Sequence, residues 1–398
     1  MDRVADLIRR ARTATGLDDF GEDSFREGLQ RLSLALDTEA RLSEGGAAAF
    51  DAQIIHFLSQ RLQVEDWYRR HPEIDEQEIV APLIGLGLPR TGSTALGCLL
   101  GEDPAVRTLR NWEASTPCPP PETQTEESDP RIEITRQSLA RRAELFPRMQ
   151  TMFPSSPTAP TECHGLQALD FKTQLFQALA RVPSYSDWLN NKADLVPTYR
   201  YVKRVLKLLQ WRCPPKRWRL KNPSHIVFIE ALDEVFPDAR FWMTHRDIAD
   251  VVPSSADLYY ELARAFSNDI DKVYLGQLNA DTWELGMRRL IAFRDAGNEH
   301  RFFDVHFAPF QKDPLPVIER LYDFIGEDFT AEVRARMEKW RAETPREKHG
   351  DHRYDPADFG LNVEVLRERF RFYSDHFGVQ TSRKRHDNNA GKDGDHDR

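Results

Sequence analysis

A short segment around residue 90 combines glycines, hydroxyl groups and a single cation in a pattern that suits phosphate binding. Gly87 and Gly92 stand five residues apart, and Thr94 lies where a P-loop carries its metal-binding hydroxyl. Ser93 occupies the position of the usual P-loop lysine, and Arg90 is the only cation between the two glycines. An apolar strand, a tight turn and a helix start direct several backbone N–H groups at one point, which favours an anion. The segment predicts a phosphate-binding loop without the lysine that works with Mg²⁺ on a β/γ-phosphate.

Arg246 and Ser254 form a second pattern suited to a phosphate. Arg246 ends an apolar strand, and a helix with acids in its first turn begins near Asp247. Ser254 follows Arg246 by eight residues. A guanidinium fork binds two oxygens of a phosphomonoester, and a hydroxyl donates to a third. The pair therefore predicts a second phosphate site.

Three further side chains have the types needed for charge stabilisation and proton transfer. Lys221 ends a predicted strand over 218–221, and His225 follows at the start of a predicted helix. A histidine that faces a cleft from a helix start is able to take a proton from an acceptor hydroxyl. Glu113 comes just beyond a short predicted strand over 106–109, and an ion-paired structural role is the alternative for it. We expect His225 to act as general base, with Glu113 as the second candidate.

The periodicity of apolar residues predicts an α/β fold. Short apolar strands alternate with amphipathic helices after residue 80, as in a central, mostly parallel sheet flanked by helices. We therefore expect a P-loop-type three-layer fold with a helical N-terminal extension. A further strand is expected over 301–305. Helices are expected over 94–100, 131–151, 165–181, 196–212, 226–236, 278–296, 315–325, 330–342 and 361–377.

Composition divides the chain into three regions. Residues 1–78 are predicted to be a helical extension that packs on the core or on another subunit. Residues 79–378 are predicted to form the main domain, and residues 379–398 are charged and almost free of apolar groups, which predicts disorder. The proline-rich stretch 116–130 predicts a loop near the phosphate site, where lids and substrate gates occur.

Overall composition bounds the class of protein. The 398 residues are 40% hydrophobic and 30% charged, as in a soluble globular protein. A net charge of −9 disfavours a general nucleic-acid binder. There is no membrane-length apolar run and no signal peptide, so we expect a cytoplasmic protein without a membrane partner. The four cysteines and twelve histidines show no metal-ligand spacing, so no metal site is expected. Assembly into a homo-oligomer stays open.

Together these motifs resemble those of the sulfotransferases that use 3′-phosphoadenosine 5′-phosphosulfate (PAPS), above all the broad bacterial group. In that family a Pro, a Lys or Arg, and a Ser/Thr-Gly-Ser/Thr-Thr run wrap the phosphosulfate, and residues 89–94, Pro-Arg-Thr-Gly-Ser-Thr, fill this pattern. Trp112-Glu113 and the Lys-x-Pro-x-His segment from Lys221 are further likenesses. The resemblance covers roughly residues 80–325. It implies transfer of a sulfuryl group from PAPS to a hydroxyl or amine of a small-molecule acceptor, with release of adenosine 3′,5′-bisphosphate (PAP).

The resemblance also implies roles for individual positions. Arg90 and Lys221 would stabilise charge on the bridging and leaving oxygens, and His225 would be the base, although it follows the lysine by four residues rather than the family's two. Arg246 and Ser254 would hold the 3′-phosphate. The 5′-phosphate would be held, beside Arg90, by Thr91, Gly92, Ser93, Thr94 and Ala95. The counterpart of the family's late loop over the 3′-phosphate would be Lys348, His349 and Gly350.

Two other functions stay open on the sequence. A P-loop kinase or NTPase would need a lysine in place of Ser93 and an aspartate for Mg²⁺. A non-catalytic member would keep the fold as an interaction module, with the N-terminal helices as its working surface.

Overall fold

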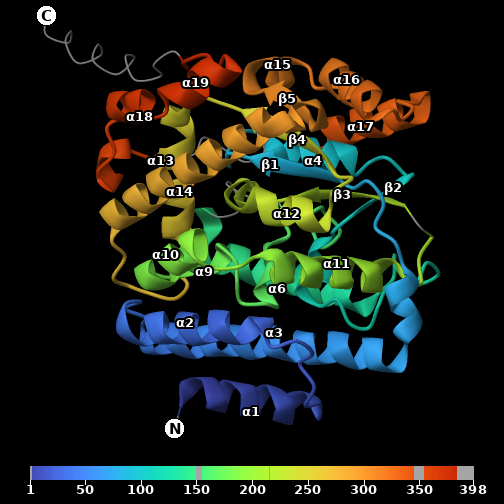
Figure 1. Ribbon diagram of the computed structural model, residues 1–398, viewed down its shortest axis with the longest axis vertical. Coiled ribbons are helices and arrows are strands. Elements are labelled where there is room, and N and C mark those ends of the chain that lie inside the picture. Colours follow the sequence, from blue (N-terminus) through green and yellow to red (C-terminus); the bar gives the residue numbers. More distant parts are fainter. Residues whose placement is uncertain (1, 149–154, 215, 345–353, 383–398) are drawn as a thin grey trace, which may run out of the picture.

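A parallel β-sheet forms the centre of the molecule. The computed structural model describes residues 2–148, 155–214, 216–344 and 354–382 (Figure 1). Within these residues the sheet has the strand order β2-β3-β1-β4-β5, and each pair of neighbours is parallel. The strands are β1 Leu83–Gly87, β2 Val106–Thr108, β3 Arg217–Lys221, β4 Arg240–His245 and β5 Phe302–His306. The predicted α/β fold with a central parallel sheet is confirmed.

Helices pack on both faces of this sheet. The N-terminal helices are α1 Arg3–Thr15, α2 Ser24–Thr38 and α3 Glu44–Arg70. The middle helices are α4 Ser93–Leu100, α5 Asn111–Ser115, α6 Pro130–Leu145, α8 His164–Ala168, α9 Leu175–Leu179, α10 Pro183–Asn191, α11 Val196–Gln210 and α12 Ile229–Val235. The later helices are α13 Ile248–Ala263, α14 Lys272–Phe293, α15 Phe307–Lys312, α16 Leu315–Ile325, α17 Ala331–Glu343, α18 Val363–Arg369 and α19 Arg371–Phe377.

β1 lies in the middle of the sheet because both of its faces are apolar. All of its residues are buried. Successive side chains of a strand point to opposite faces, so Ile84 and Leu86 join the hydrophobic cluster of α11, α12 and α14, whereas Leu83 joins that of α4, α16 and α17. β1 pairs with β3 on one side and β4 on the other. Successive strands thus pass to opposite sides of β1, and ligands of α/β proteins bind at the carboxyl ends of strands at such a point.

The N-terminal helices pack against the rest of the chain. Figure 1 shows α1, α2 and α3 as a layer on the side away from α15 and α16, with α9, α10 and α11 between that layer and the sheet. The ring of Phe57 in α3 lies edge-on to Phe176 of α9 at 6.0 Å between centroids. The buried guanidinium of Arg61 donates to the Asp170 carboxylate at 3.2 Å and to the Phe20 carbonyl at 2.7 Å. The helical extension predicted from the sequence therefore shares the main hydrophobic core.

Two predicted helices are each broken in two. The segment expected as one helix over 165–181 contains α8 and α9, because Phe171 between them has a left-handed backbone with φ 54°. The carboxylate of Asp170 also accepts hydrogen bonds from Arg61 and Thr198, which holds this turn in place. The segment over 361–377 contains α18 and α19. The end of the predicted tail, residues 383–398, lies outside the described residues. No helix among the described residues is long and apolar enough to cross a membrane.

Candidate active site

The loop after β1 has the backbone geometry of an anion-binding turn. Gly87 has φ 115° and Gly92 has φ 91°, values that favour glycine. Arg90 has φ 61°, which is uncommon for a residue with a side chain and costs about 1–3 kcal/mol. The buried hydroxyl of Thr91 donates to the Leu88 carbonyl at 2.8 Å and hydrogen-bonds the hydroxyl of a β4 threonine. The loop is thus held rigidly in a strained conformation, which is typical of functional sites.

The first turn of α4 presents unpaired amide groups to this loop. Gly92 is the N-cap residue of α4, and no side chain caps this helix end. The first N–H groups of a helix have no partner within it, and they carry partial positive charge. Ser93, Thr94 and Ala95 supply these groups and line a cavity. This end of α4 is therefore suited to an anion, as the sequence predicts.

The second predicted phosphate pair converges on the same loop. The Nη1 atom of Arg246 donates to the carbonyl of Arg90 at 3.0 Å, and Nε of Arg90 donates to the hydroxyl of Ser254 at 3.1 Å. The guanidinium of Arg246 also pairs with Asp250 at 3.1 Å and lies 4.4 Å from the ring centre of Phe307. Two segments far apart in the sequence thus form one basic site at the ends of β1 and β4.

The charges of the two arginines disfavour each other at this site. Burial, and next the charge of Arg246, lower the pKa of the Arg90 guanidinium from its ordinary value. A lowered pKa means that the charged form is destabilised by its surroundings. An anion that contacts both guanidinium groups offsets the repulsion between them. The electrostatics therefore favour an anionic ligand.

A cavity of about 1330 Å³ lies over this basic site. Arg90 and Arg246 line it, as does Lys221 at the end of β3, so the carboxyl ends of the three central strands all face it. A pocket for one drug-sized ligand measures about 300–1,000 Å³. The cavity thus has room for a nucleotide together with a second molecule.

Lys221 pairs with a carboxylate that was not predicted from the sequence. Its ammonium lies 2.8 Å from Oε1 of Glu162 and donates to the hydroxyl of Thr94 at 3.4 Å. The other carboxylate oxygen of Glu162 lies 3.6 Å from Nε2 of His164, whose Nδ1 lies 3.1 Å from the Thr173 hydroxyl. Lys221, Glu162 and His164 all line the cavity. They form a compact acid–base group beside the phosphate loop.

Backbone pairing places Glu162 at the end of β3. The N–H of Thr161 donates to the Leu109 carbonyl at 2.8 Å, and the N–H of Cys163 donates to the Lys221 carbonyl at 3.1 Å. These bonds extend the sheet edge by an irregular segment, and the residue between them faces the cavity. The position of Glu162 thus depends on pairing across about 60 residues of chain.

The surroundings of Glu162 favour its ionised form. Burial by itself would raise the pKa of Glu162, but chiefly the charge of Lys221 outweighs burial, and the pKa lies below its ordinary value. Burial lowers the pKa of His164. The carboxylate is therefore ready to accept a proton at neutral pH, which is the state that a general base requires.

The structure does not bring His225 to the cavity. Its side chain is buried, and its Nδ1 lies 2.8 Å from the hydroxyl of Tyr199, with the two rings 5.5 Å apart. Burial lowers its pKa to about 3. His225 is not among the cavity-lining residues. The expected role as general base does not fit this geometry, because the short helical segment Pro223–Phe228 turns the ring into the core.

We predict that His225 instead makes the stability of the fold depend on pH. A neutral histidine that resists protonation in the native state destabilises the fold as pH falls below its unfolded pKa of 6.5 toward its native value of about 3. His225→Gln keeps an acceptor for Tyr199 but does not titrate. Between pH 7 and pH 5 the free energy of unfolding of this variant should fall by about 2 kcal/mol less than that of the unaltered protein. Urea unfolding at both pH values measures the difference, and equal losses would contradict the assignment.

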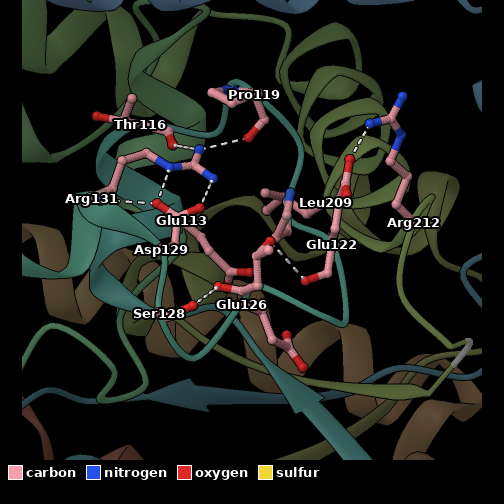
Figure 2. A network of polar contacts seen from close by, with 12 residues as sticks. Glu113, Thr116, Pro119, Glu122, Glu126, Ser128, Asp129, Arg131, Leu209 and Arg212 are labelled. Atoms are coloured by element: carbon pink, nitrogen blue, oxygen red, sulfur yellow. Dashed lines mark hydrogen bonds and ion pairs between the residues drawn. The ribbon is translucent and has the colours of Figure 1, made fainter.

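Glu113 also lies away from the cavity, in a buried ion-pair network. Its carboxylate is fully buried and lies 2.6 Å from guanidinium nitrogens of both Arg107 and Arg110. Arg110 also pairs with Glu126 at 2.9 Å. Near Glu113, Arg131 donates to the backbone carbonyls of Thr116 and Pro119 and so holds the proline-rich loop (Figure 2). The expectation that Glu113 acts as a base does not fit, because its oxygens are committed to two arginines.

Of the remaining predicted site residues, some line the cavity and others do not or lie outside the described residues. Gly92, Ser93, Thr94 and Ala95 line the cavity, whereas the side chain of Thr91 is buried within the loop. Lys348, His349 and Gly350 lie outside the described residues. Among the described residues no group of three or more His, Cys, Asp or Glu side chains is placed to hold a metal ion.

Comparison with known proteins agrees with this geometry. A model of the sulfotransferase family matches residues 82–331. The sulfotransferase STF9 from Mycobacterium avium is 33% identical, with a TM-score of 0.88 over 94% of this chain and 97% of that one. STF1 from Mycobacterium tuberculosis H37Rv is 32% identical, with a TM-score of 0.80 over 92% of this chain and 98% of that one.

Curated relatives match over a shorter stretch. The omega-hydroxy-beta-dihydromenaquinone-9 sulfotransferases Stf3 of Mycobacterium bovis and Mycobacterium tuberculosis are each 29% identical over 156 residues, which is 37% of this chain. The match spans 39% of the length of each relative. The family match over the sheet, the phosphate loop and the flanking helices shows that this chain belongs to the sulfotransferase family and is a sulfotransferase.

Proposed function

We propose that this sulfotransferase transfers a sulfuryl group from PAPS to a hydroxyl, or an amine, of a small-molecule acceptor. The convergence of Arg90 and Arg246 on one cavity, beside the Lys221–Glu162 pair, is the observation that carries the proposal. The basic site suits the two phosphate groups of the nucleotide. The Lys221–Glu162 pair suits the sulfuryl group and the acceptor that attacks it.

The residues of the loop fit the donor. The amides at the start of α4, with the hydroxyls of Ser93 and Thr94, would hold the 5′-phosphate. Arg246 and Ser254 would hold the 3′-phosphate, and the ring of Phe307 beside Arg246 offers an apolar surface next to it. The crowding of the Arg90 and Arg246 charges makes binding of a dianion favourable.

In the proposed reaction Glu162 is the general base. It takes the proton of the acceptor hydroxyl while the acceptor oxygen bonds to sulfur and the bond from sulfur to the bridging phosphate oxygen breaks. Lys221 and Arg90 stabilise the charge that develops on that bridging oxygen. Such transfer depends mainly on positioning and charge stabilisation, as in phosphoryl transfer.

Lys221 couples donor binding to the strength of this base. Its ammonium contacts both the hydroxyl of Thr94 on the loop and the carboxylate of Glu162. An anionic donor on the loop competes with Glu162 for the ammonium. A weaker pair raises the pKa of Glu162, so the carboxylate becomes a stronger base when the donor is in place.

The acceptor is proposed to be an apolar molecule that carries a hydroxyl group. Phe57, Leu175, Leu258 and Leu262 contribute apolar side chains to the cavity. The relatives named Stf3 act, by their names, on an omega-hydroxylated menaquinone. Phenols and long-chain alcohols are therefore the first acceptors to assay.

We predict that Arg246→Gln removes recognition of the 3′-phosphate. The unaltered protein should bind PAP at least about tenfold more tightly than adenosine 5′-monophosphate, because only PAP offers a second phosphate to the guanidinium. In the variant this ratio should approach one. Isothermal titration calorimetry measures it, with Arg264→Gln, a substitution of an exposed arginine at the C-cap of α13, as the control.

The same measurements test the proposed function against a kinase. Tighter binding of ATP–Mg²⁺ than of PAP would contradict it. So would a failure of the protein to move radioactive sulfate from labelled PAPS to any member of a panel of phenols, alcohols and amines.

A further inference from the structure

Faces of three helices form one wall of the cavity. Gln53 and Phe57 of α3 are four residues apart and lie on the same side of that helix. Ser255, Leu258 and Leu262 follow the same spacing along α13. The residues at the start of α9 lie between them, since α9 packs on α13 and the Phe176 ring packs on Phe57. This three-helix wall is mostly apolar.

Each of the three helices also contributes one polar atom that lacks a partner. Among the described residues, Oε1 of Gln53, Oε1 of Gln174 and Oγ of Ser255 are buried and have no hydrogen-bond partner. Gln174, the N-cap residue of α9, and Ser255 are each only 1% exposed. All three residues line the cavity. An unpaired buried polar atom is costly, so three of them along one wall indicate a bound molecule that pairs with them.

The orientation of Gln174 is set by a neighbour. Its Nε2 atom donates to Oδ1 of Asn190 at 3.1 Å, so the unpaired atom of its amide is the oxygen, which only accepts. The amide oxygen of Gln53 likewise only accepts, and a serine hydroxyl both accepts and donates. These atoms together require hydrogen-bond donors. None of the residues that the three-helix wall contributes to the cavity lining is an acid, a lysine or an arginine, so a neutral donor fits better than a charged one.

We propose that the acceptor molecule carries, apart from the hydroxyl that is sulfated, a second neutral hydrogen-bond donor that binds Gln53, Gln174 and Ser255. The class is an apolar molecule with a hydroxyl or N–H group at a distance from its reacting end. In this proposal the Ser255 hydroxyl and the Gln53 side chain rotate to direct their oxygens toward such a group, whereas Gln174 keeps its bond to Asn190. This inference rests on the proposed function, because it assigns the cavity wall to the acceptor.

The wall also gives the N-terminal helices a part in substrate choice. Gln53 and Phe57 lie in α3, outside residues 82–331 that match the family model. The donor-binding residues Arg90 and Arg246 lie inside that range. Selection of the acceptor thus uses a segment of the chain that selection of the nucleotide does not.

The test compares acceptor molecules with and without N–H donor groups at the end of the chain. We take 4-alkylphenols whose chain ends in a primary carboxamide and their N,N-dimethyl counterparts, over a series of chain lengths. With labelled PAPS, the primary amide of the best length should have about tenfold higher kcat/KM, because a site built for a hydrogen bond rejects an analogue that leaves its groups unpaired. Calorimetry with the PAP-bound enzyme should show the same preference in Kd, without turnover.

Two variants tie this preference to the wall. Ser255→Ala and Gln53→Met should each bring the ratio of the two amides close to one while PAP affinity is unchanged. Ser33→Ala is the matched control, because Oγ of Ser33 is also buried and unpartnered but lies on α2, outside the cavity lining. Sulfation of both amides at equal rates at every chain length would overturn this inference alone. If the unaltered enzyme neither binds PAP nor sulfates any acceptor, the proposed function is overturned instead.

Discussion

Replacing Glu162 by glutamine is expected to lower kcat by about 10²–10⁴-fold, the usual contribution of a general base. The substitution keeps the size of the side chain but removes the group that takes the acceptor proton. Affinity for PAP should not fall, because the nucleotide contacts proposed here come from the loop and from Arg246, and because Lys221 loses the carboxylate that competes for it. Single-turnover assays with labelled PAPS, together with calorimetry for PAP, separate the two quantities.

Glu113→Gln is the matched control for this prediction. It removes a buried carboxylate between Arg107 and Arg110, so it should lower the free energy of unfolding while the folded fraction keeps its turnover. A Glu162→Gln enzyme that retains full kcat would contradict the assignment. Loss of turnover in folded Glu113→Gln protein would move the base to Glu113.

Replacing Lys221 by methionine is expected to lower kcat by about 10²–10³-fold, the usual cost of removing one group that stabilises charge in the transition state. Methionine fills much of the space of the lysine stem but brings no charge. Lys207→Met on α11, which removes an ammonium that donates to a backbone carbonyl at 2.7 Å, is the control and should retain activity.

A second prediction concerns how kcat/KM of Lys221→Met depends on pH. Glu162 acts when ionised, and its pKa in the unaltered protein lies below its ordinary value, so the acid limb of kcat/KM lies below the range in which an ordinary glutamate titrates. Without Lys221 the effect of burial on Glu162 is no longer outweighed, and the pKa rises. The acid limb should then move to higher pH, and an unmoved limb would show that Lys221 does not act on the base.

The central sheet and the phosphate loop could be predicted from the sequence because their signals are local. Buried parallel strands appear as short apolar runs, and the spacing of Gly87 and Gly92 around Arg90 is typical of a phosphate-binding turn. The Arg246–Ser254 spacing follows from one turn at a strand end and two turns of α13. Each of these features is therefore determined by residues that lie close together in the sequence.

Glu162, the partner of Lys221, could not be predicted from the sequence in the same way. Glu162 reaches Lys221 only because the segment around Cys163 pairs with the ends of two strands that are distant in sequence. His225 has the expected residue type near the end of a strand, but the direction of its ring depends on the core around Tyr199. Residue type and order are thus a weak guide where a side chain's direction is set by non-local packing.

The link between Thr91 and Thr244 has a consequence for nucleotide selectivity. It ties the phosphate loop to the strand that leads to Arg246, and Gly87 sits opposite Thr244 in the register of these strands. In the proposed function, the strands that carry the two phosphate sites therefore run side by side, about 4.8 Å apart, and this fixes where the loop and the Arg246 side chain start. A positional isomer with its extra phosphate on the 2′ oxygen would present it away from the Arg246 guanidinium, so the fixed placement of Arg246 beside the loop would discriminate between such isomers.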